Sequence, residues 1–137
     1  MKKYLKDVTK PNQTVNPLFQ FLGITIEQLS PEKTVMRLLI KNEFHQGAGV
    51  VAGGLLATIA DEVMAHAVLA NLDNGQSTAT IELNIRYLRP IKFGEIIAIA
   101  KIVKKGRNII TVSSEVRDEK NFLLACSGAS FMVINKK

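Results

Sequence analysis

A glycine-rich turn that leads directly into an apolar helical pattern is the feature that most constrains this 137-residue chain. Four glycines fall within residues 47–54, and the proline-free segment 53–72 that follows has the length of a helix. Apolar side chains recur along it at three- and four-residue spacing, which predicts a buried helix. They are Leu55, Leu56, Ile59, Ala60, Val63, Met64, Ala67 and Val68. Because an ordinary surface helix shows water a broad polar face, this helix has to be covered by other elements.

The predicted helix carries only a narrow polar stripe, made of Thr58, Asp61, Glu62 and His66. A membrane-spanning helix is excluded, because each of its two carboxylates would cost roughly 2.5 to 3.5 kcal/mol near the bilayer centre. Glu62 and His66 stand four residues apart and are interpreted as a pair on the one solvated edge of a core helix. Asp61 is interpreted as functional because of the glycines before the helix.

Those glycines let the backbone approach a ligand closely at the start of the helix, where free N–H groups can stabilise a developing oxyanion. Asp61 lies eight residues beyond Gly53, which is about 12 Å along a helix. A base and an oxyanion donor must both stand about 3 Å from one reacting centre. The sequence therefore predicts that the two groups come from different copies of the chain, across a two-fold axis.

The same stretch resembles the signature of the hot-dog-fold acyl-CoA thioesterases, in the branch that includes the phenylacetate-pathway enzymes. That signature has an asparagine, a glycine, a histidine with two glycines, and an aspartate eight residues beyond the first glycine of the pair. The spacing matches in this chain, but Gln46 and Ala52 replace the asparagine and the histidine. The resemblance extends to residues 80–90, 94–95 and 106–107, and covers roughly residues 40 to 134.

The resemblance implies hydrolysis of an acyl-CoA to the free acid and CoA, without a metal or a separate cofactor. It assigns Gly53 and Gln46 to the oxyanion site and Asp61 to the role of general base or nucleophile, between which the sequence does not decide. The family has a serine or threonine at the Thr80 position, where it helps to hold the attacking water; a surface-facing β-forming threonine is the alternative. Gln46 is one methylene longer than asparagine, and Ala52 removes an imidazole, so this site departs from the family pattern at two polar positions.

Around the helix, six segments rich in β-formers are separated by turn signals, and a short helix near residues 18–22 ends at Gly23. The expected strands are 24–29, 34–40, 77–88, 95–104, 108–117 and 122–134. Together they predict an α+β fold in which a six-stranded antiparallel sheet wraps around one long helix. The resemblance implies the same arrangement, the hot-dog fold. We expect one domain over residues 1–137, with 1–16 as a loose N-terminal segment. The start lacks the apolar core of a signal peptide and Cys126 is the only cysteine, so we expect a cytoplasmic protein.

A net charge of +6 indicates an anionic partner, and the basic residues concentrate between 84 and 107. Coenzyme A offers three phosphate groups, so we assign Arg89, Lys92 and Arg107, together with Gly54, to substrate or CoA binding. Nucleic acid is disfavoured, because no aromatic residues are interleaved with the basic ones and no helix-turn-helix pattern occurs. The predicted partners are therefore an acyl-CoA and a second copy of the chain, in a homodimer or a dimer of dimers, with neither nucleic acid nor membrane.

Two other functions remain open. The departures at Gln46 and Ala52 are also compatible with an acyl-CoA-binding module that has lost catalysis. Hot-dog enoyl-CoA hydratases use an aspartate and a histidine spaced as Asp61 and His66 are here. On a continuous helix, however, five residues turn these side chains about 140° apart.

Overall fold

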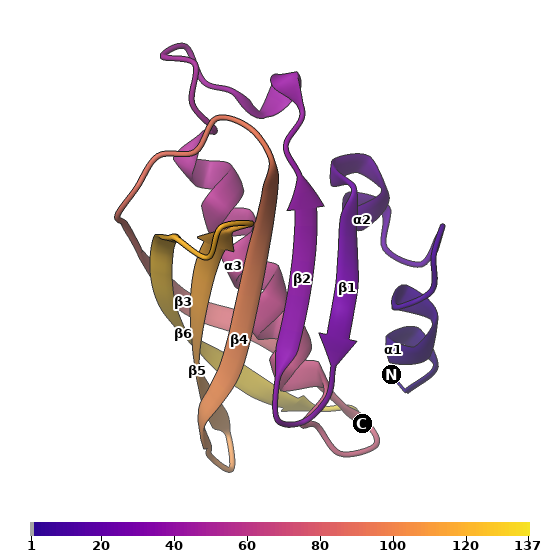
Figure 1. Ribbon diagram of the computed structural model, residues 1–137. Coiled ribbons are helices and arrows are strands. Elements are labelled where there is room, and N and C mark those ends of the chain that lie inside the picture. Colours follow the sequence, from indigo (N-terminus) through magenta and orange to yellow (C-terminus); the bar gives the residue numbers. More distant parts are fainter. Residues whose placement is uncertain (1) are drawn as a thin grey trace.

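The computed structural model describes residues 2–137 and contains one six-stranded antiparallel sheet with a long helix, α3, packed on one face (Figure 1). The strand order is β1-β2-β4-β5-β6-β3, so that β1 and β3 form the two edges. The strands are β1 (Ile24–Leu29), β2 (Thr34–Leu39), β3 (Gln76–Tyr87), β4 (Glu95–Lys105), β5 (Ile109–Asp118) and β6 (Leu123–Asn135). The helices are α1 (Lys2–Val8), α2 (Pro17–Leu22), the 3-10 turn η1 (Asn42–Phe44) and α3 (Gly53–Leu69). This is the hot-dog fold that the sequence predicted.

Helix α3 begins at Gly53, as expected, and ends three residues before the predicted Leu72. Asn71 explains the early end, because its side-chain amide donates to the carbonyl of Ala67 in the last turn (2.8 Å). The apolar stripe of α3 is buried against the sheet, and its fully covered members include Ile59, Val63, Met64 and Val68. The sheet side of this core alternates buried and exposed residues most regularly along β5. Within residues 2–137, no helix combines the length and the apolar character needed to cross a membrane.

Strand β3 departs from the simple alternation that its sequence suggests. Its register with β6 shifts between Thr80 and Glu82, which is a β-bulge around Ile81. Before the bulge, Thr80 points toward α3; after it, Leu83 packs against the core. The extra residue switches which side chains face the helix, so Ile81 is left about half exposed instead of sharing a face with Leu83.

The expected loose segment over residues 1–16 is wrong for Lys2–Val8, which forms helix α1. Val8 is 3% exposed and joins the main core, and Tyr4 packs against it. This helix lies beside β1, at the edge of the sheet opposite β3 (Figure 1). Short helices of this kind form through tertiary contacts more than through their own propensity. Met1 lies outside the described residues.

Candidate active site

The turn before α3 is held from both sides. Gln46 donates its backbone N–H to the carbonyl of Val50 (2.8 Å), and the Gly49 N–H donates to the Gln46 carbonyl (2.9 Å). Gly49 has φ +78°, a left-handed conformation that glycine adopts without steric cost. Beyond the turn, the Val51 N–H donates to the carbonyl of Ile91 (2.9 Å), which ties the start of α3 to the β3–β4 connection. These hydrogen bonds fix the position of the first turn of α3.

The N-terminus of α3 has no side-chain cap, because its N-cap residue is Ala52. In the described part of the chain, neither the Gly53 nor the Gly54 N–H has a hydrogen-bond acceptor, whereas the Leu55 N–H already donates to the Ala52 carbonyl (3.0 Å). Free N–H groups with a helix dipole behind them form a site for negative charge. The Gly53 and Gly54 N–H groups are therefore available to a ligand, and the oxyanion role assigned to Gly53 stays a prediction.

The side chain of Gln46 lies in the same turn. Its Oε1 accepts a hydrogen bond from the Ala48 N–H (2.6 Å), so the oxygen is engaged within the turn. The amide nitrogen then remains to donate, and donation is the role predicted for Gln46.

Tyr87, which sequence reasoning missed, closes over the start of α3. Its hydroxyl donates to the carbonyl oxygen of Gly53 (2.8 Å). A Cβ added to Gly53 would lie 3.1 Å from Cζ of the Tyr87 ring, which is too close without some movement of the ring. Gly53 therefore makes room for an aromatic ring. No sequence signal marks this contact, because the two residues are 34 positions apart.

Asp61 and Thr80 meet on the other part of the helix, next to the bulge in β3. The Thr80 Oγ1 donates to Oδ1 of Asp61 at 3.0 Å, and both side chains are at least partly accessible to solvent. The bond leaves Oδ2 without a partner among the described residues, so that oxygen is free to accept a proton. The structure thus brings two of the four predicted catalytic residues into direct contact.

The predicted binding residues fall into two groups. Arg89 and Lys92 lie in the β3–β4 connection, close to the start of α3. The Cζ atom of Arg89 lies 3.8 Å from the centroid of the Phe122 ring. A cavity of about 330 Å³ connects this region to the helix start, with Gly53, Tyr87 and Arg89 among its lining residues. Arg107, by contrast, lies in the β4–β5 turn, at the opposite end of β4. Within one chain, Arg107 is therefore not brought together with Arg89 and Lys92.

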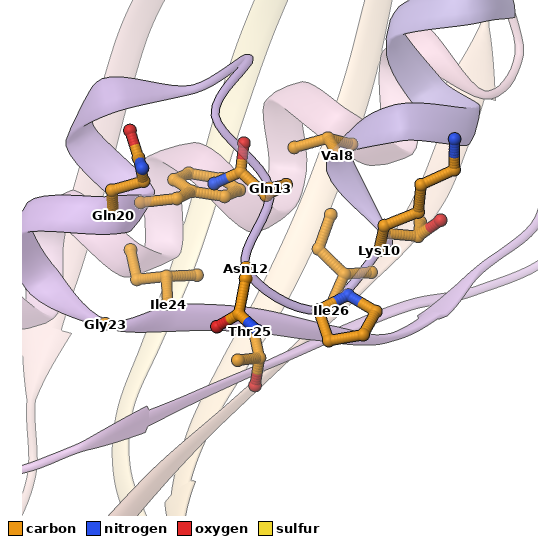
Figure 2. Close-up of a pocket in the computed structure, with 12 residues that line it drawn as sticks. Val8, Lys10, Asn12, Gln13, Gln20, Gly23, Ile24, Thr25 and Ile26 are labelled. Carbon is orange, nitrogen blue, oxygen red and sulfur yellow. The ribbon is translucent and has the colours of Figure 1, made fainter.

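A second cavity, of about 470 Å³, lies between residues 8–13, α2 and the start of β1 (Figure 2). Its lining includes the buried apolar side chains of Val8, Phe19 and Ile24 together with polar side chains such as Gln13 and Gln20. None of the predicted catalytic or binding residues lines it. It lies beside the sheet edge opposite the one that carries Thr80.

The prediction that Glu62 and His66 form a pair on a solvated edge is wrong, because His66 is buried. His66 is 3% exposed, covered by Tyr4 and Phe19, and its Nδ1 lies 3.8 Å from Oε2 of Glu62. Nδ1 donates to the Glu62 carbonyl (2.8 Å) and Nε2 accepts from the Tyr4 hydroxyl (2.9 Å). These partners assign the neutral tautomer, because a carbonyl can only accept. Sequence reasoning misjudged the pair because it missed α1, although Tyr4 and Val8 already have helical spacing.

Burial governs the titration of this pair. Burial lowers the pKa of His66 and, together with the neighbouring Asp61 carboxylate, raises the pKa of Glu62 to about 7. His66 is bonded to α1 while Asp61 bonds to β3, so the two side chains required for the hydratase hypothesis do not meet. Among residues 2–137, no group of three or more His, Cys, Asp or Glu side chains is arranged to hold a metal ion.

Comparison with known proteins identifies the family of the chain. Human acyl-coenzyme A thioesterase 13 is 28% identical over 130 residues, covering 93% of this chain and 92% of its own length. A solved thioesterase from Haemophilus influenzae superposes with a TM-score of 0.84 at 26% identity, over 93% of this chain and 95% of that one. A phenylacetic acid degradation-related protein from Ralstonia eutropha gives 0.85 at 27% identity, over 94% and 98%. The family model described as the thioesterase superfamily matches residues 48–125, which span both the helix start and the Asp61–Thr80 contact, and the chain belongs to that superfamily.

Proposed function

We propose that this protein hydrolyses an acyl-CoA thioester to the free acid and CoA, at a site shared between two copies of the chain. The observation that carries the proposal is the contact of Asp61 with Thr80 at one place on α3, with free Gly53 and Gly54 N–H groups at another. Membership of the thioesterase superfamily and the likeness to human acyl-coenzyme A thioesterase 13 support the reaction class.

In this mechanism the thioester carbonyl oxygen accepts hydrogen bonds from the Gly53 and Gly54 N–H groups at the start of α3 and from the Gln46 amide nitrogen. Asp61 Oδ2 removes a proton from water while the water oxygen bonds to the carbonyl carbon. The C–S bond then breaks, and the CoA thiolate takes up a proton and leaves as the thiol. Direct attack of Asp61 on the carbonyl, followed by hydrolysis of the anhydride, gives the same products and remains the alternative.

Thr80 has a specific place in this scheme. Its hydroxyl hydrogen is directed to Asp61 Oδ1, so it fixes the plane of the carboxylate, and its oxygen lone pairs remain to accept a hydrogen from the attacking water. An oriented carboxylate and an oriented water lower the entropic part of the barrier. Thr80 therefore acts on the water as an acceptor.

The edge of the sheet supports the shared site. Strand β3 is twelve residues long and lies at an edge, and Ile81 at its bulge is about half exposed. A long unprotected edge is a template for pairing with another strand. If two β3 strands pair antiparallel with Thr80 opposite Tyr87 of a second copy, Cβ atoms of opposite residues stand about 5 Å apart. Since Thr80 contacts Asp61 and Tyr87 contacts Gly53, this register brings the base of one copy to the oxyanion donors of the other.

The β3–β4 connection supports a CoA-binding role for Arg89 and Lys92. The cavity of about 330 Å³ leads from Gly53 to Arg89 and has largely apolar walls, including Leu56, Leu88 and Ile91. In the proposed complex the pantetheine arm lies in this cavity and the two cations meet the phosphates. A contact from Arg107 to the same CoA requires another copy of the chain, because of its place at the far end of β4.

The test of the reaction is thiol release from a panel of aromatic and aliphatic acyl-CoAs, with wild-type protein and the Asp61→Asn variant. We expect turnover of at least one thioester, and its loss in the variant. If a folded wild-type dimer binds CoA but releases no thiol from any substrate, the proposal is contradicted and the non-catalytic acyl-CoA-binding module takes its place.

The shared site has a separate test in mixed dimers. Asp61→Asn and Gln46→Ala each damage both sites of their own homodimer. A dimer with one copy of each variant keeps one intact site. In that site the Gln46→Ala chain supplies Asp61 and the Asp61→Asn chain supplies Gln46. Random mixing should therefore restore about a quarter of wild-type turnover. A mixture that stays as inactive as its parents would show that each chain holds a whole site.

A further inference from the structure

We infer that Tyr87 is a positioning residue of the oxyanion site, which holds and polarises the peptide unit between Gly53 and Gly54. The inference rests on the proposed function. It starts from the hydrogen bond between the Tyr87 hydroxyl and the Gly53 carbonyl oxygen (2.8 Å). Tyr87 does not itself touch the thioester in this scheme.

The hydrogen bond acts on a particular peptide group. The carbonyl of Gly53 and the N–H of Gly54 belong to the same planar unit, so a donor on the oxygen polarises the N–H at the other end. That N–H is one of the two without an acceptor among the described residues at the start of α3. Tyr87 therefore makes this N–H a stronger donor and limits rotation of the peptide plane.

The packing of the ring adds a second constraint. In the described structure, the Cβ position of Gly53 lies 3.1 to 3.3 Å from three atoms of Tyr87, whereas nothing lies within 4 Å of the Cβ position of Gly54. The ring therefore rests on the first glycine and leaves open space beside the second. The two neighbouring glycines have different tasks: Gly53 admits the tyrosine, and Gly54 leaves space for a ligand.

The place of Tyr87 in the sheet explains how it can serve this purpose. It is the last residue of β3, and the next residue is anchored to β6 because the Leu88 N–H donates to the Leu124 carbonyl (2.8 Å). A side chain at the end of a paired strand is better fixed than one on a free loop. The helix start without a capping side chain is thus oriented by a residue of the sheet.

Tyr87→Phe tests this assignment, because phenylalanine keeps the ring on Gly53 and removes only the hydroxyl. Removing a whole oxyanion donor costs about 10²- to 10³-fold in kcat, and a residue that supports a donor should cost less, about tenfold. We expect that loss in kcat, with KM within about twofold and an unchanged melting temperature. The chain's only other tyrosine provides the matched control, Tyr4→Phe, whose hydroxyl bonds to His66 and not to the helix start. The control should keep wild-type kcat.

A spectroscopic measurement separates positioning from a merely structural role. Phenylacetyl-CoA and hexanoyl-CoA, labelled with ¹³C at the thioester carbonyl, are bound to Asp61→Asn protein with and without Tyr87→Phe. Polarisation by the oxyanion donors lowers the carbonyl stretching frequency in difference infrared spectra, and Tyr87→Phe should return it part of the way to the free value. An unchanged kcat and an unchanged frequency in Tyr87→Phe would overturn the role of Tyr87 and leave the thioesterase proposal intact. Absence of turnover and of any carbonyl shift in the parent protein would overturn both.

Discussion

Asp61 and Glu62 are neighbours on one helix, but the two faces of α3 on which they lie have different surroundings. Asp61 points toward the edge strand β3 and accepts a hydrogen bond from Thr80. Glu62 points toward α1 and lies beside His66, whose two ring nitrogens are both satisfied. The face with Asp61 is open to solvent and to β3, and we call it the open face; the face with His66 is covered by α1, and we call it the closed face.

The closed face extends into a chain of hydrogen bonds. Asn16 donates its side-chain N–H to the Tyr4 hydroxyl (2.8 Å), which donates to His66, which donates to the Glu62 carbonyl. Asn16 also caps α2 by accepting from the Phe19 N–H (3.1 Å). A buried polar network that is satisfied in this way fixes the position of the elements it joins, here α1, α2 and α3. From this comparison we expect substitutions on the open face to affect turnover and substitutions on the closed face to affect stability.

The largest expected difference between the two faces is in turnover. Asp61→Asn should reduce thiol release by about 10³-fold or more, because the amide can neither accept the proton of water nor attack the carbonyl. Glu62→Gln, one residue away, should stay within about threefold of wild type. The measurement is kcat/KM for the best acyl-CoA of the panel. Equal losses in the two variants would remove the distinction between the faces.

The free energy of unfolding, unlike turnover, should depend mainly on the closed face. His66→Ala removes a ring that is 3% exposed and packs on Phe19, and it leaves the Tyr4 hydroxyl without its acceptor. We expect a loss of about 3 kcal/mol in the free energy of unfolding, measured in urea. Turnover per folded molecule should change little. His45→Ala, at the chain's other histidine, is the control and should cost clearly less, since His45 lies in a more accessible loop. A His66→Ala variant as stable as wild type would contradict the structural role of the network.

The sequence predicted the sheet and the open face better than the closed one, for physical reasons. Strand bounds agree with the structure within one residue, because alternation and turn residues are local signals. The contact partner of Thr80, Asp61, is singled out in the sequence by its spacing from the glycines, which reflects the helix itself. The closed face depends on α1, whose seven residues become helical through contacts of Tyr4 with a residue 62 positions away. The bulge in β3 and the contact of Tyr87 with Gly53 are likewise products of tertiary packing, so composition and periodicity do not contain them.

Thr80→Val sharpens the comparison on the open face. Valine has nearly the shape of threonine but can neither orient Asp61 nor accept a hydrogen from water, so turnover should fall about tenfold. Thr78→Val is the matched control on the same strand, because the Thr78 hydroxyl donates to the Met132 carbonyl and not to Asp61. Both variants should unfold at similar urea concentrations. Equal turnover in the two would assign Thr80 to the strand alone.

The smallest expected effect concerns pH and the closed face. The folded protein raises the pKa of Glu62 from 4.5 to about 7, chiefly by burial and then through the charge of Asp61, so between these values the folded state binds more protons at Glu62 than the unfolded state does. Stability contributed by Glu62 is therefore present below pH 4.5 and is lost as the pH rises to about 7. His66 acts in the opposite sense, because its lowered pKa costs stability as the pH falls below 6.5. The two effects overlap in the wild type, so the difference in free energy of unfolding between Glu62→Gln and wild type isolates the carboxylate.

That difference should move in favour of the variant from pH 4.5 to 7 and then level off. The total change should be about 1 kcal/mol after allowance for solvent screening of a side chain that is a quarter exposed. Urea unfolding of both proteins at several pH values measures it, and a difference that stays constant over this range would show that Glu62 titrates alike in the folded and unfolded chain.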